Sequence, residues 1–327
     1  MRALVTGSNG FIGSFLVEKC LDKGYDVRCL VRRTSNLRWI ENLDVELVYG
    51  ELNDPESLAK PVRDVEIIFH VGGVTKARTE QDFMRGNYHT TKNLLDAAAR
   101  YDRSLEKFLF ISSQAAGGPS PDSSTFLTEK QAQYPISAYG RAKLLAERQV
   151  LNFSSSFHTT ILRPPAVYGP RDKDFLTLFR SVKRGWVPML GSGQQRISII
   201  YIDDLIEGIF LSLSNPKARG ELYFLSSDEA PSYRQLIDHI AASLYADPRI
   251  IALPSGMVHF FSLVSTGYAS LTRSTPLINR DKVTEMRQFA WLGSNKKAKQ
   301  QLGFNPTVNL QKGMSTTANW YTRHQWL

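Results

Sequence analysis

The sequence predicts an α/β protein in which a doubly wound parallel sheet is joined to a smaller, interleaved C-terminal region. Short apolar runs alternate with stretches of helical spacing through the first half of the chain, and a glycine-rich turn follows the first of these runs. Such alternation is typical of βαβ units, because parallel strands need a crossover connection. We therefore expect a dinucleotide-binding Rossmann domain over residues 1–168. Residues 169–327 are expected to form mainly a substrate-binding region, which returns to the sheet near residues 197–225.

The expected elements follow one another along the chain. Strands are expected at residues 3–6, 26–31, 45–48, 66–71, 107–111, 159–162 and 196–202. Helices are expected at residues 11–21, 81–101, 137–153, 204–213 and 233–244, where apolar residues recur at helical spacing. The apolar segment 250–271 is interrupted by Pro254 and His259. We interpret it as a helical lid over a substrate pocket, with an interfacial membrane helix as the alternative.

The composition is that of a globular protein with a large core. Of the 327 residues, 42% are apolar and 22% are charged. The formal net charge of +9 favours anionic ligands such as phosphorylated cofactors. Lysines and arginines are scattered, and no nucleic-acid-binding motif is present. We therefore interpret the charge as a solvated basic surface and expect no nucleic-acid partner.

The cysteine count and the lengths of the apolar runs indicate where in the cell the protein resides. Cys20 and Cys29 are too few for a disulfide framework or a metal cluster, so we expect a cytoplasmic protein without a metal site. The first predicted strand begins directly after Met1, and we expect no signal peptide. Since no apolar run reaches about 18 residues, we expect no transmembrane helix. Peripheral contact with a membrane is left open.

The glycine-rich turn has the chemistry of a phosphate cradle. Gly7, Gly10 and Gly13 lie between the first predicted strand and the first predicted helix. Glycine lets backbone N–H groups approach a pyrophosphate closely, and a helix N-terminus adds unpaired donors and a favourable dipole. The last glycine is also expected to permit close packing of the helix on the strand. This placement predicts a dinucleotide-binding site, with an ordinary glycine turn as the alternative.

The tip of the second predicted strand indicates which dinucleotide binds. Arg32 and Arg33 stand where an acidic residue would bind the adenosine ribose of NAD. An arginine instead matches the 2′-phosphate of NADP by its charge and its planar fork of donors. We therefore expect NADP. NAD is the alternative, with the two arginines stacked on adenine or in solvent.

Tyr139 and Lys143 are four residues apart in a predicted helix and therefore share one of its faces. A free tyrosine has a pKa of about 10, and a nearby ammonium group lowers that pKa by favouring the phenolate. We expect Tyr139 to exchange a proton with a substrate alcohol or carbonyl while hydride moves at a nicotinamide. Two exposed helix residues are the alternative for this pair.

Ser112 and Ser113 follow an apolar run that is predicted to be a buried strand. Ligands bind beyond the carboxyl ends of the strands in parallel α/β sheets, so a serine at this point is placed to hold a substrate oxygen. Capping of the strand is the alternative role. The glycine turn, the serines and the Tyr/Lys pair occur in the expected order along the chain, and each supports the interpretation of the others.

In these motifs the sequence resembles the extended short-chain dehydrogenase/reductase family, in its epimerase/dehydratase branch, over almost the whole chain. The resemblance implies that Ser113, Tyr139 and Lys143 are catalytic. It also implies that Asn87 and Pro164 belong to the coenzyme site, with Pro164 near the nicotinamide. We expect the coenzyme to be bound by Gly7, Asn9, Gly10, Phe11, Ile12, Gly13, Arg32, Arg33, Glu51, Leu52, Val71, Gly72, Asn87, Tyr139, Lys143 and Pro164.

The sequence is compatible with two classes of reaction found in this family, carbonyl reduction and sugar-nucleotide conversion. Ala166 stands where members acting on UDP-sugars usually carry asparagine, whereas residues 191–196 resemble the segment whose arginine meets the nucleotide phosphates. The arginines at the strand tip resemble those of dihydroflavonol reductase and 3β-hydroxysteroid dehydrogenase relatives. We expect a reductase or dehydrogenase of a moderately apolar ketone, secondary alcohol or aldehyde. A sugar-nucleotide epimerase or dehydratase is the alternative, and a non-catalytic cofactor sensor is a third class.

Three further residues are expected to contact the small-molecule substrate, namely Thr75, Gln114 and Arg196. Thr75 and Gln114 come just after predicted strands, and Arg196 is the arginine of the segment that resembles a phosphate-binding one. In relatives, the helices that correspond to residues 81–101 and 137–153 often form dimer bundles. The resemblance therefore implies a homodimer.

Overall fold

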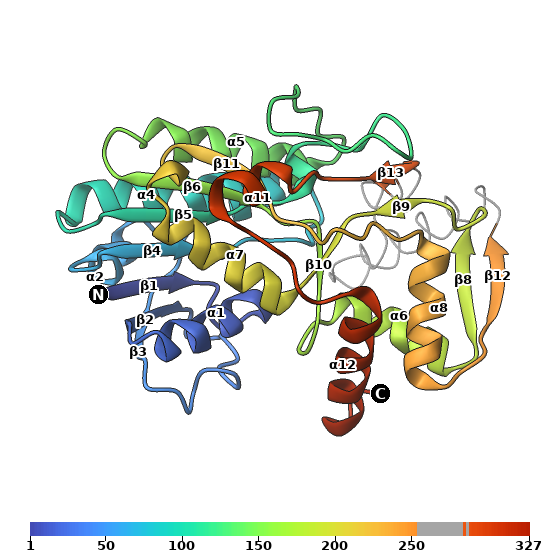
Figure 1. The fold of residues 1–327 in the computed structure, drawn as a ribbon. Helices are drawn as coiled ribbons and strands as arrows, with labels where there is room; N and C mark the ends of the chain where they lie inside the picture. Colours follow the sequence, from blue (N-terminus) through green and yellow to red (C-terminus); the bar gives the residue numbers. More distant parts are fainter. Residues whose placement is uncertain (254–283, 286–287) are drawn as a thin grey trace.

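The computed structural model describes residues 1–253, 284–285 and 288–327. A seven-stranded parallel sheet forms its centre, in the order β11-β6-β5-β4-β1-β2-β3 (Figure 1). Its strands are β1 (Arg2–Thr6), β2 (Asp26–Val31), β3 (Glu46–Tyr49), β4 (Ile67–His70), β5 (Lys107–Ile111), β6 (His158–Arg163) and β11 (Glu221–Phe224). The α/β fold class predicted from the sequence is confirmed.

Helices cover both faces of the sheet. One face carries α1 (Phe11–Asp22) and α7 (Ile202–Ser214), and the other carries η1 (Glu56–Leu58), α2 (Ala59–Val62), α4 (Thr90–Tyr101) and α5 (Ala138–Asn152). Because successive strand residues point to opposite faces, Val5 joins the core under α1 and α7, whereas Leu4 joins the core under α4 and α5. Burial on both faces explains why these strands are almost wholly apolar.

The prediction of one continuous helix over residues 81–101 is wrong, because a π-helical turn interrupts it. The structure has α3 (Glu80–Phe83), a π-helical turn η2 (Met84–His89) and then α4. Gly86 lies so close to Val74 that a Cβ would be 2.5 Å from its Cγ2. The side chain of Asn87 donates to the carbonyl oxygens of Val74 (2.9 Å) and Phe83 (3.0 Å). This competition of a side chain with the backbone ladder accounts for the interruption.

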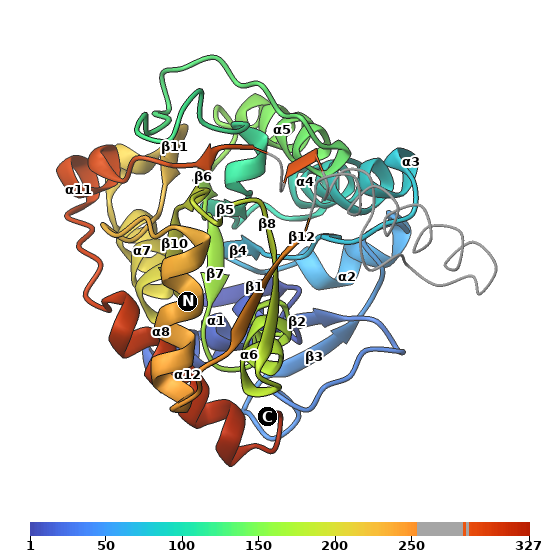
Figure 2. The same cartoon turned by 90° about the vertical axis from the view of Figure 1, so that its right-hand side faces the viewer.

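The second half of the chain forms a smaller layer beside the sheet. Its helices α6 (Asp174–Lys183), α8 (Tyr233–Leu244) and α12 (Leu310–Arg323) pack together, with α8 between the other two (Figure 2). Three two-stranded sheets pair β7 (Ala166–Tyr168) with β10 (Ile199–Tyr201), β8 (Trp186–Leu190) with β12 (Arg249–Leu253), and β9 (Arg196–Ile197) with β13 (Ala290–Trp291). The short helices η4 (Pro216–Ala218) and α11 (Lys296–Leu302) flank β11, which lies beside β6 in the main sheet.

The helical lid expected over residues 250–271 begins as a strand. Residues 250–253 belong to β12 and pair in parallel with β8, so a helix is wrong for them. The β-branched Ile250 and Ile251 favour the extended backbone. The rest of the expected lid lies outside the described residues. In the described part of the chain, no helix is long and apolar enough to cross a membrane.

Asp204 ties the C-terminal part of the chain to the sheet layer. Its buried carboxylate, in the first turn of α7, accepts hydrogen bonds from the Thr307 nitrogen (2.9 Å), the Thr307 hydroxyl (3.0 Å) and the Val308 nitrogen (3.1 Å). These bonds hold the segment that leads into α12. Removing this buried carboxylate lowers the free energy of unfolding, because its three donors are left without hydrogen-bond partners.

We expect Asp204→Ala to lower the free energy of unfolding by about 3 kcal/mol. Urea unfolding followed by tryptophan fluorescence measures this change. The neighbouring Asp203 is exposed and serves as the matched control, with an expected change below about 0.5 kcal/mol for Asp203→Ala. Equal losses in the two variants would contradict the anchoring role.

Candidate active site

The carboxyl ends of β1 and β4 meet where the chain crosses from one half of the sheet to the other. Gly7 follows β1 with a φ of +69°, and a Cβ there would lie 2.8 Å from the backbone nitrogen of Gly72. A Cβ on Gly13 would lie 2.1 Å from the Gly7 carbonyl oxygen. The glycine of α1 therefore packs on the turn itself rather than on the strand. The turn keeps the N-terminus of α1 and its unpaired N–H groups accessible from the sheet edge.

A groove of about 1090 Å³, called the main groove below, runs from this turn across the carboxyl edge of the sheet. Most predicted coenzyme-binding residues line it: Gly7, Asn9, Gly10, Phe11, Ile12, Gly13, Arg32, Glu51, Leu52, Val71, Gly72, Tyr139 and Pro164. Ser113 and Thr75 line it too. Its size and its glycine-rich end, which a Cβ would fill, fit a nicotinamide dinucleotide with the pyrophosphate at the N-terminus of α1.

The two arginines at the tip of β2 lie in different surroundings. Arg32 lines the main groove, whereas the guanidinium of Arg33 stacks 5.3 Å from the centre of the Tyr49 ring. The chain turns after Arg32, whose carbonyl oxygen accepts from the Ser35 nitrogen (3.0 Å), and this turn separates the two side chains. Of this pair, the structure therefore brings Arg32 to the groove.

Arg38, which was not among the expected site residues, also lines the main groove. Its guanidinium lies 4.3 Å from the centre of the Trp39 ring and 5.1 Å from that of Trp326, near the end of the chain. Arg180 in turn donates two hydrogen bonds to the Trp326 carbonyl oxygen (3.1 and 2.9 Å). Arg38 is only six residues after Arg32, and this short separation could have indicated a second arginine at the site. Its packing against Trp326 could not be predicted, because the two residues are far apart in the sequence.

Two other predicted site residues act behind the walls of the groove. Asn87 accepts from the Val74 nitrogen (3.2 Å) and donates to the Val74 carbonyl (2.9 Å), so it shapes the loop after β4. Arg196 donates to the carbonyl oxygens of Ala230 (3.1 Å) and Ser123 (3.1 Å). Neither residue is on the wall of the main groove, and their contacts with coenzyme and substrate stay predictions.

The start of α5 places Tyr139 beside Ser113. The hydroxyl of Ser137 caps this helix by accepting from the Gly140 nitrogen (3.1 Å). A Cβ on Gly140 would lie 2.3 Å from the Ala115 carbonyl oxygen, which allows the helix to approach η3 (Gln114–Ala116) closely. Ser113 and Tyr139 both line the main groove, and the Ser113 hydroxyl acts on the phenol of Tyr139. Next to them Gln114 is buried, and no described group is a hydrogen-bond partner of its Nε2.

The protonation of Tyr139 differs from the expectation. Burial raises the pKa of Tyr139 to about 12; the Ser113 hydroxyl opposes this rise only in part, and the charge of Glu285 adds to it. The expected lowering by Lys143 is therefore wrong for this structure. Loss of solvent around the phenol dominates, because it penalises the phenolate. At neutral pH Tyr139 is consequently a proton donor.

Lys143 lies beneath the groove wall and is almost wholly buried. Its Nζ donates to the Ile111 carbonyl oxygen (3.0 Å) and sits 4.7 Å from the centre of the Phe110 ring. Burial lowers the pKa of Lys143 to about 8, while Glu147 acts in the opposite direction. The ammonium form is therefore dominant at neutral pH and is lost as the pH rises through about 8.

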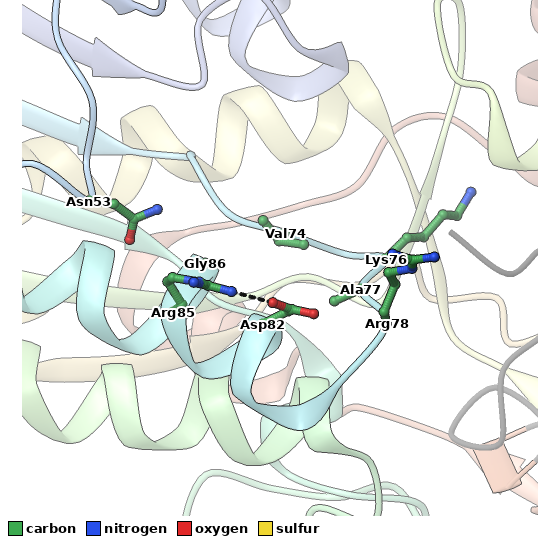
Figure 3. A pocket seen from close by; sticks show the side chains of 8 residues that line it. All are labelled: Asn53, Val74, Lys76, Ala77, Arg78, Asp82, Arg85 and Gly86. Carbon is green, nitrogen blue, oxygen red and sulfur yellow. Dashed lines mark hydrogen bonds and ion pairs between the residues drawn. The ribbon is translucent and has the colours of Figure 1, made fainter. Parts of the chain in front are cut away.

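A smaller pocket of about 270 Å³ opens beside the main groove and shares wall residues with it. In Figure 3, Asn53 stands at one end of this pocket, and Lys76 and Arg78 stand at the other. Arg85 is paired with Asp82 between them. Lys76 forms an ion pair with Asp174 (2.6 Å), which joins the loop after β4 to the start of α6. This exposed pair connects two residues of the main groove wall.

Comparisons with known proteins agree with this geometry. The model of the NAD dependent epimerase/dehydratase family matches residues 3–225. The chain is 29% identical over 325 residues to ceramide reductase from Caulobacter vibrioides, which covers 99% of this chain and 95% of that protein. It is 23% identical over 331 residues to the decarboxylating sterol-4-alpha-carboxylate 3-dehydrogenase of Mus musculus, with 97% and 90% coverage.

A solved structure shares the fold over nearly the whole chain. The UDP-glucuronic acid 4-epimerase from Bacillus cereus, in complex with UDP-glucuronic acid and NAD, superimposes with a TM-score of 0.80 at 24% identity. The match covers 99% of this chain and 100% of the epimerase chain.

The glycine turn makes a direct prediction about dinucleotide binding. In Gly13→Ala the new methyl group displaces the Gly7 carbonyl, so we expect the affinity for NADPH to fall at least about tenfold. Quenching of tryptophan fluorescence on titration with NADPH measures this loss. Gly24→Asn is the control, because φ is +76° there and no atom lies within 4 Å of a Cβ. Parental affinity in Gly13→Ala would remove the turn from the binding site.

Proposed function

Because the chain belongs to the NAD dependent epimerase/dehydratase family, we propose that it is an NADP-dependent reductase or dehydrogenase of an apolar carbonyl compound. The resemblance to the extended short-chain dehydrogenase/reductase family is confirmed, and so is nicotinamide-dependent oxidoreductase chemistry. The observation that carries the finer proposal is that Ser113 and Tyr139 share the wall of the main groove, with the buried Lys143 on the same face of α5 as Tyr139.

The chemistry of these side chains favours reduction at neutral pH. A bound nicotinamide coenzyme would supply the hydride. The Ser113 hydroxyl is placed to hold the carbonyl oxygen, and Tyr139 holds the proton that this oxygen takes up when it becomes an alcohol. Because the pKa of Tyr139 is about 12, its phenol is protonated before turnover. The buried Lys143 ammonium stabilises the phenolate that remains.

The substrate side of the main groove supports an apolar substrate. Six apolar or aromatic residues line it there, namely Val167, Phe175, Leu178, Ile197, Tyr233 and Leu236. Arg196, which a sugar nucleotide would need at its phosphates, instead satisfies two carbonyl oxygens of the chain. Two of the relatives are named for a ceramide and a sterol, which are also apolar. We therefore propose a lipid-like ketone, aldehyde or secondary alcohol as the substrate.

The adenosine end of the groove supports NADP as the coenzyme. Arg32 and Arg38 line this end together with Ser35, whose hydroxyl accepts from the Arg32 nitrogen (3.1 Å). Two guanidinium groups and a hydroxyl suit a phosphate monoester, which carries more negative charge than a ribose hydroxyl. The related epimerase was solved with NAD, so coenzyme preference is a property to be measured for this chain.

The other proposals concern assembly and location. We propose a homodimer that uses α4 and α5, which lie in the two expected helical segments 81–101 and 137–153. We also propose a cytoplasmic location, and peripheral membrane contact as the means of reaching an apolar substrate. The size-exclusion profile of the purified protein tests the first of these proposals. Fractionation of the host cell tests the other two.

We expect net oxidation of NADPH when the protein is given long-chain ketones or aldehydes, and we expect Tyr139→Phe to reduce turnover at least about a thousandfold. Loss of absorbance at the nicotinamide band measures turnover, and fluorescence titration shows whether Tyr139→Phe still binds NADPH. Conversion of a UDP- or dTDP-sugar without added coenzyme, together with no reaction of apolar carbonyls, would instead establish the epimerase or dehydratase alternative.

We expect Arg32→Asp to weaken NADPH binding about a hundredfold while leaving NADH binding within a few-fold, since the carboxylate repels the 2′-phosphate. Parallel titrations with the two coenzymes measure this difference. Arg33→Asp is the matched control, because Arg33 stacks on Tyr49 and is not on the groove wall. If the parent protein binds both coenzymes equally, the charge-based preference is wrong.

A further inference from the structure

A buried carboxylate lies directly behind the candidate active site. Glu147 is 2% exposed and accepts from the Ser112 hydroxyl at 2.5 Å. Arg163, which is 1% exposed, donates to both of its oxygens, from Nε at 2.8 Å and from Nη2 at 2.6 Å. The two side chains thus form a bidentate ion pair inside the core, and a serine hydroxyl completes the carboxylate's hydrogen bonds.

Each member of this cluster adjoins a residue of the proposed reaction. Ser112 precedes Ser113 at the end of β5, and Arg163 precedes Pro164 at the end of β6. Glu147 lies one helical turn after Lys143 and two turns after Tyr139, so the three share one face of α5. The carboxylate therefore joins the segments that carry the serine, the tyrosine–lysine pair and the proline on the groove wall.

We propose that Glu147 is a positioning residue that holds these three segments in register. Its negative charge also acts on the neighbouring Lys143. The inference rests on the proposed reaction, and it adds a residue that the glycine, serine and Tyr-x-x-x-Lys motifs do not contain. Arg163 is its partner in this role, since a carboxylate buried without a counter-charge would be protonated or would unfold the site.

The buried ion pair is expected to add little to the free energy of unfolding, which leaves positioning as its role. Taking two charges out of water costs several kcal/mol per ion, and apolar residues of similar volume are often as stable in the same place. Arg163 also stacks 5.5 Å from the centre of the Phe224 ring, in surroundings that would accept an apolar side chain. A pair of methionines is therefore a suitable replacement that keeps the volume and removes both charges.

The charged and titratable groups around Lys143 identify Glu147 as its source of negative charge. On α5, Tyr139 and Glu147 share its face of the helix, and beyond Glu147 lies Arg163 on β6. The charge of Lys143 acts on His70 of β4, and that of Glu285 acts on Tyr139. Burial lowers the pKa of His70 to about 3, so this ring is neutral, and Tyr139 is a neutral phenol. Among these groups, Glu147 is the one whose charge raises the pKa of Lys143.

The test compares Glu147→Met/Arg163→Met with the parent between pH 6 and pH 10. The parent should lose reductase activity as the pH rises through about 8. In the double variant the negative charge is absent, so the pKa of Lys143 falls, and we expect this loss about one pH unit lower. We also expect kcat at pH 7 to fall about tenfold or more, with KM for NADPH within about twofold and the melting temperature within a few degrees.

Two conservative variants keep the proposal falsifiable if the double variant does not fold. Glu147→Asp keeps the charge but is one methylene shorter, so kcat should fall about tenfold while the pH at which activity is lost stays unchanged. Ser112→Ala removes one hydrogen bond and should leave that pH unchanged as well. Parental kcat in Glu147→Asp, or an unshifted pH profile in a folded double variant, would overturn the proposal.

A measurement without turnover separates this inference from the proposed function. The Lys143 Nζ resonance of protein labelled with 15N-lysine, assigned with Lys143→Arg, reports protonation directly. We expect its midpoint to move to lower pH in the double variant, even if no carbonyl substrate is ever converted. An unchanged midpoint would refute the electrostatic role of Glu147. A lowered midpoint together with no reductase activity would refute only the proposed function.

Discussion

The candidate site exists because all strands of a parallel sheet end at a common edge. The turn after β1, the loop after β4, the serines after β5 and the proline after β6 meet there, although they are far apart in the sequence. Between β1 and β4 the chain crosses to the other half of the sheet, and the loops at this point diverge. The main groove is the space that this divergence leaves, and every proposed role depends on it.

Close packing and buried polar contacts fix the positions of the helices and side chains at this edge of the sheet. At two points the backbone of a helix approaches a carbonyl oxygen so closely that only glycine fits, at Gly13 and at Gly140. Behind the edge, Glu147 pairs with Arg163, and Asn87 bonds to the loop after β4. Unpaired polar groups are costly in such surroundings, so each group has one strongly favoured arrangement. The proposed catalytic side chains take their positions from these contacts.

The burial that fixes the geometry also sets the protonation states. It raises the pKa of Tyr139 to about 12, lowers the pKa of Lys143 to about 8, and leaves His70 neutral. A protonated phenol beside an ammonium suits proton donation to a carbonyl oxygen at neutral pH. The same phenol in water would have a pKa of about 10, so the protein environment increases the fraction of Tyr139 that carries its proton.

The sequence alone determined the alternation of strands and helices in the first half of the chain, the glycine turn and the Tyr139–Lys143 spacing, because these follow from patterns within a few residues. It also showed two arginines at the tip of β2, but not that Arg32 lines the groove while its neighbour stacks on a tyrosine. Only the tertiary structure decided the π-helical turn, the direction of the Tyr139 pKa and the pairing of Glu147 with Arg163. Those properties arise from contacts between distant segments and from the exclusion of water, which no local pattern records.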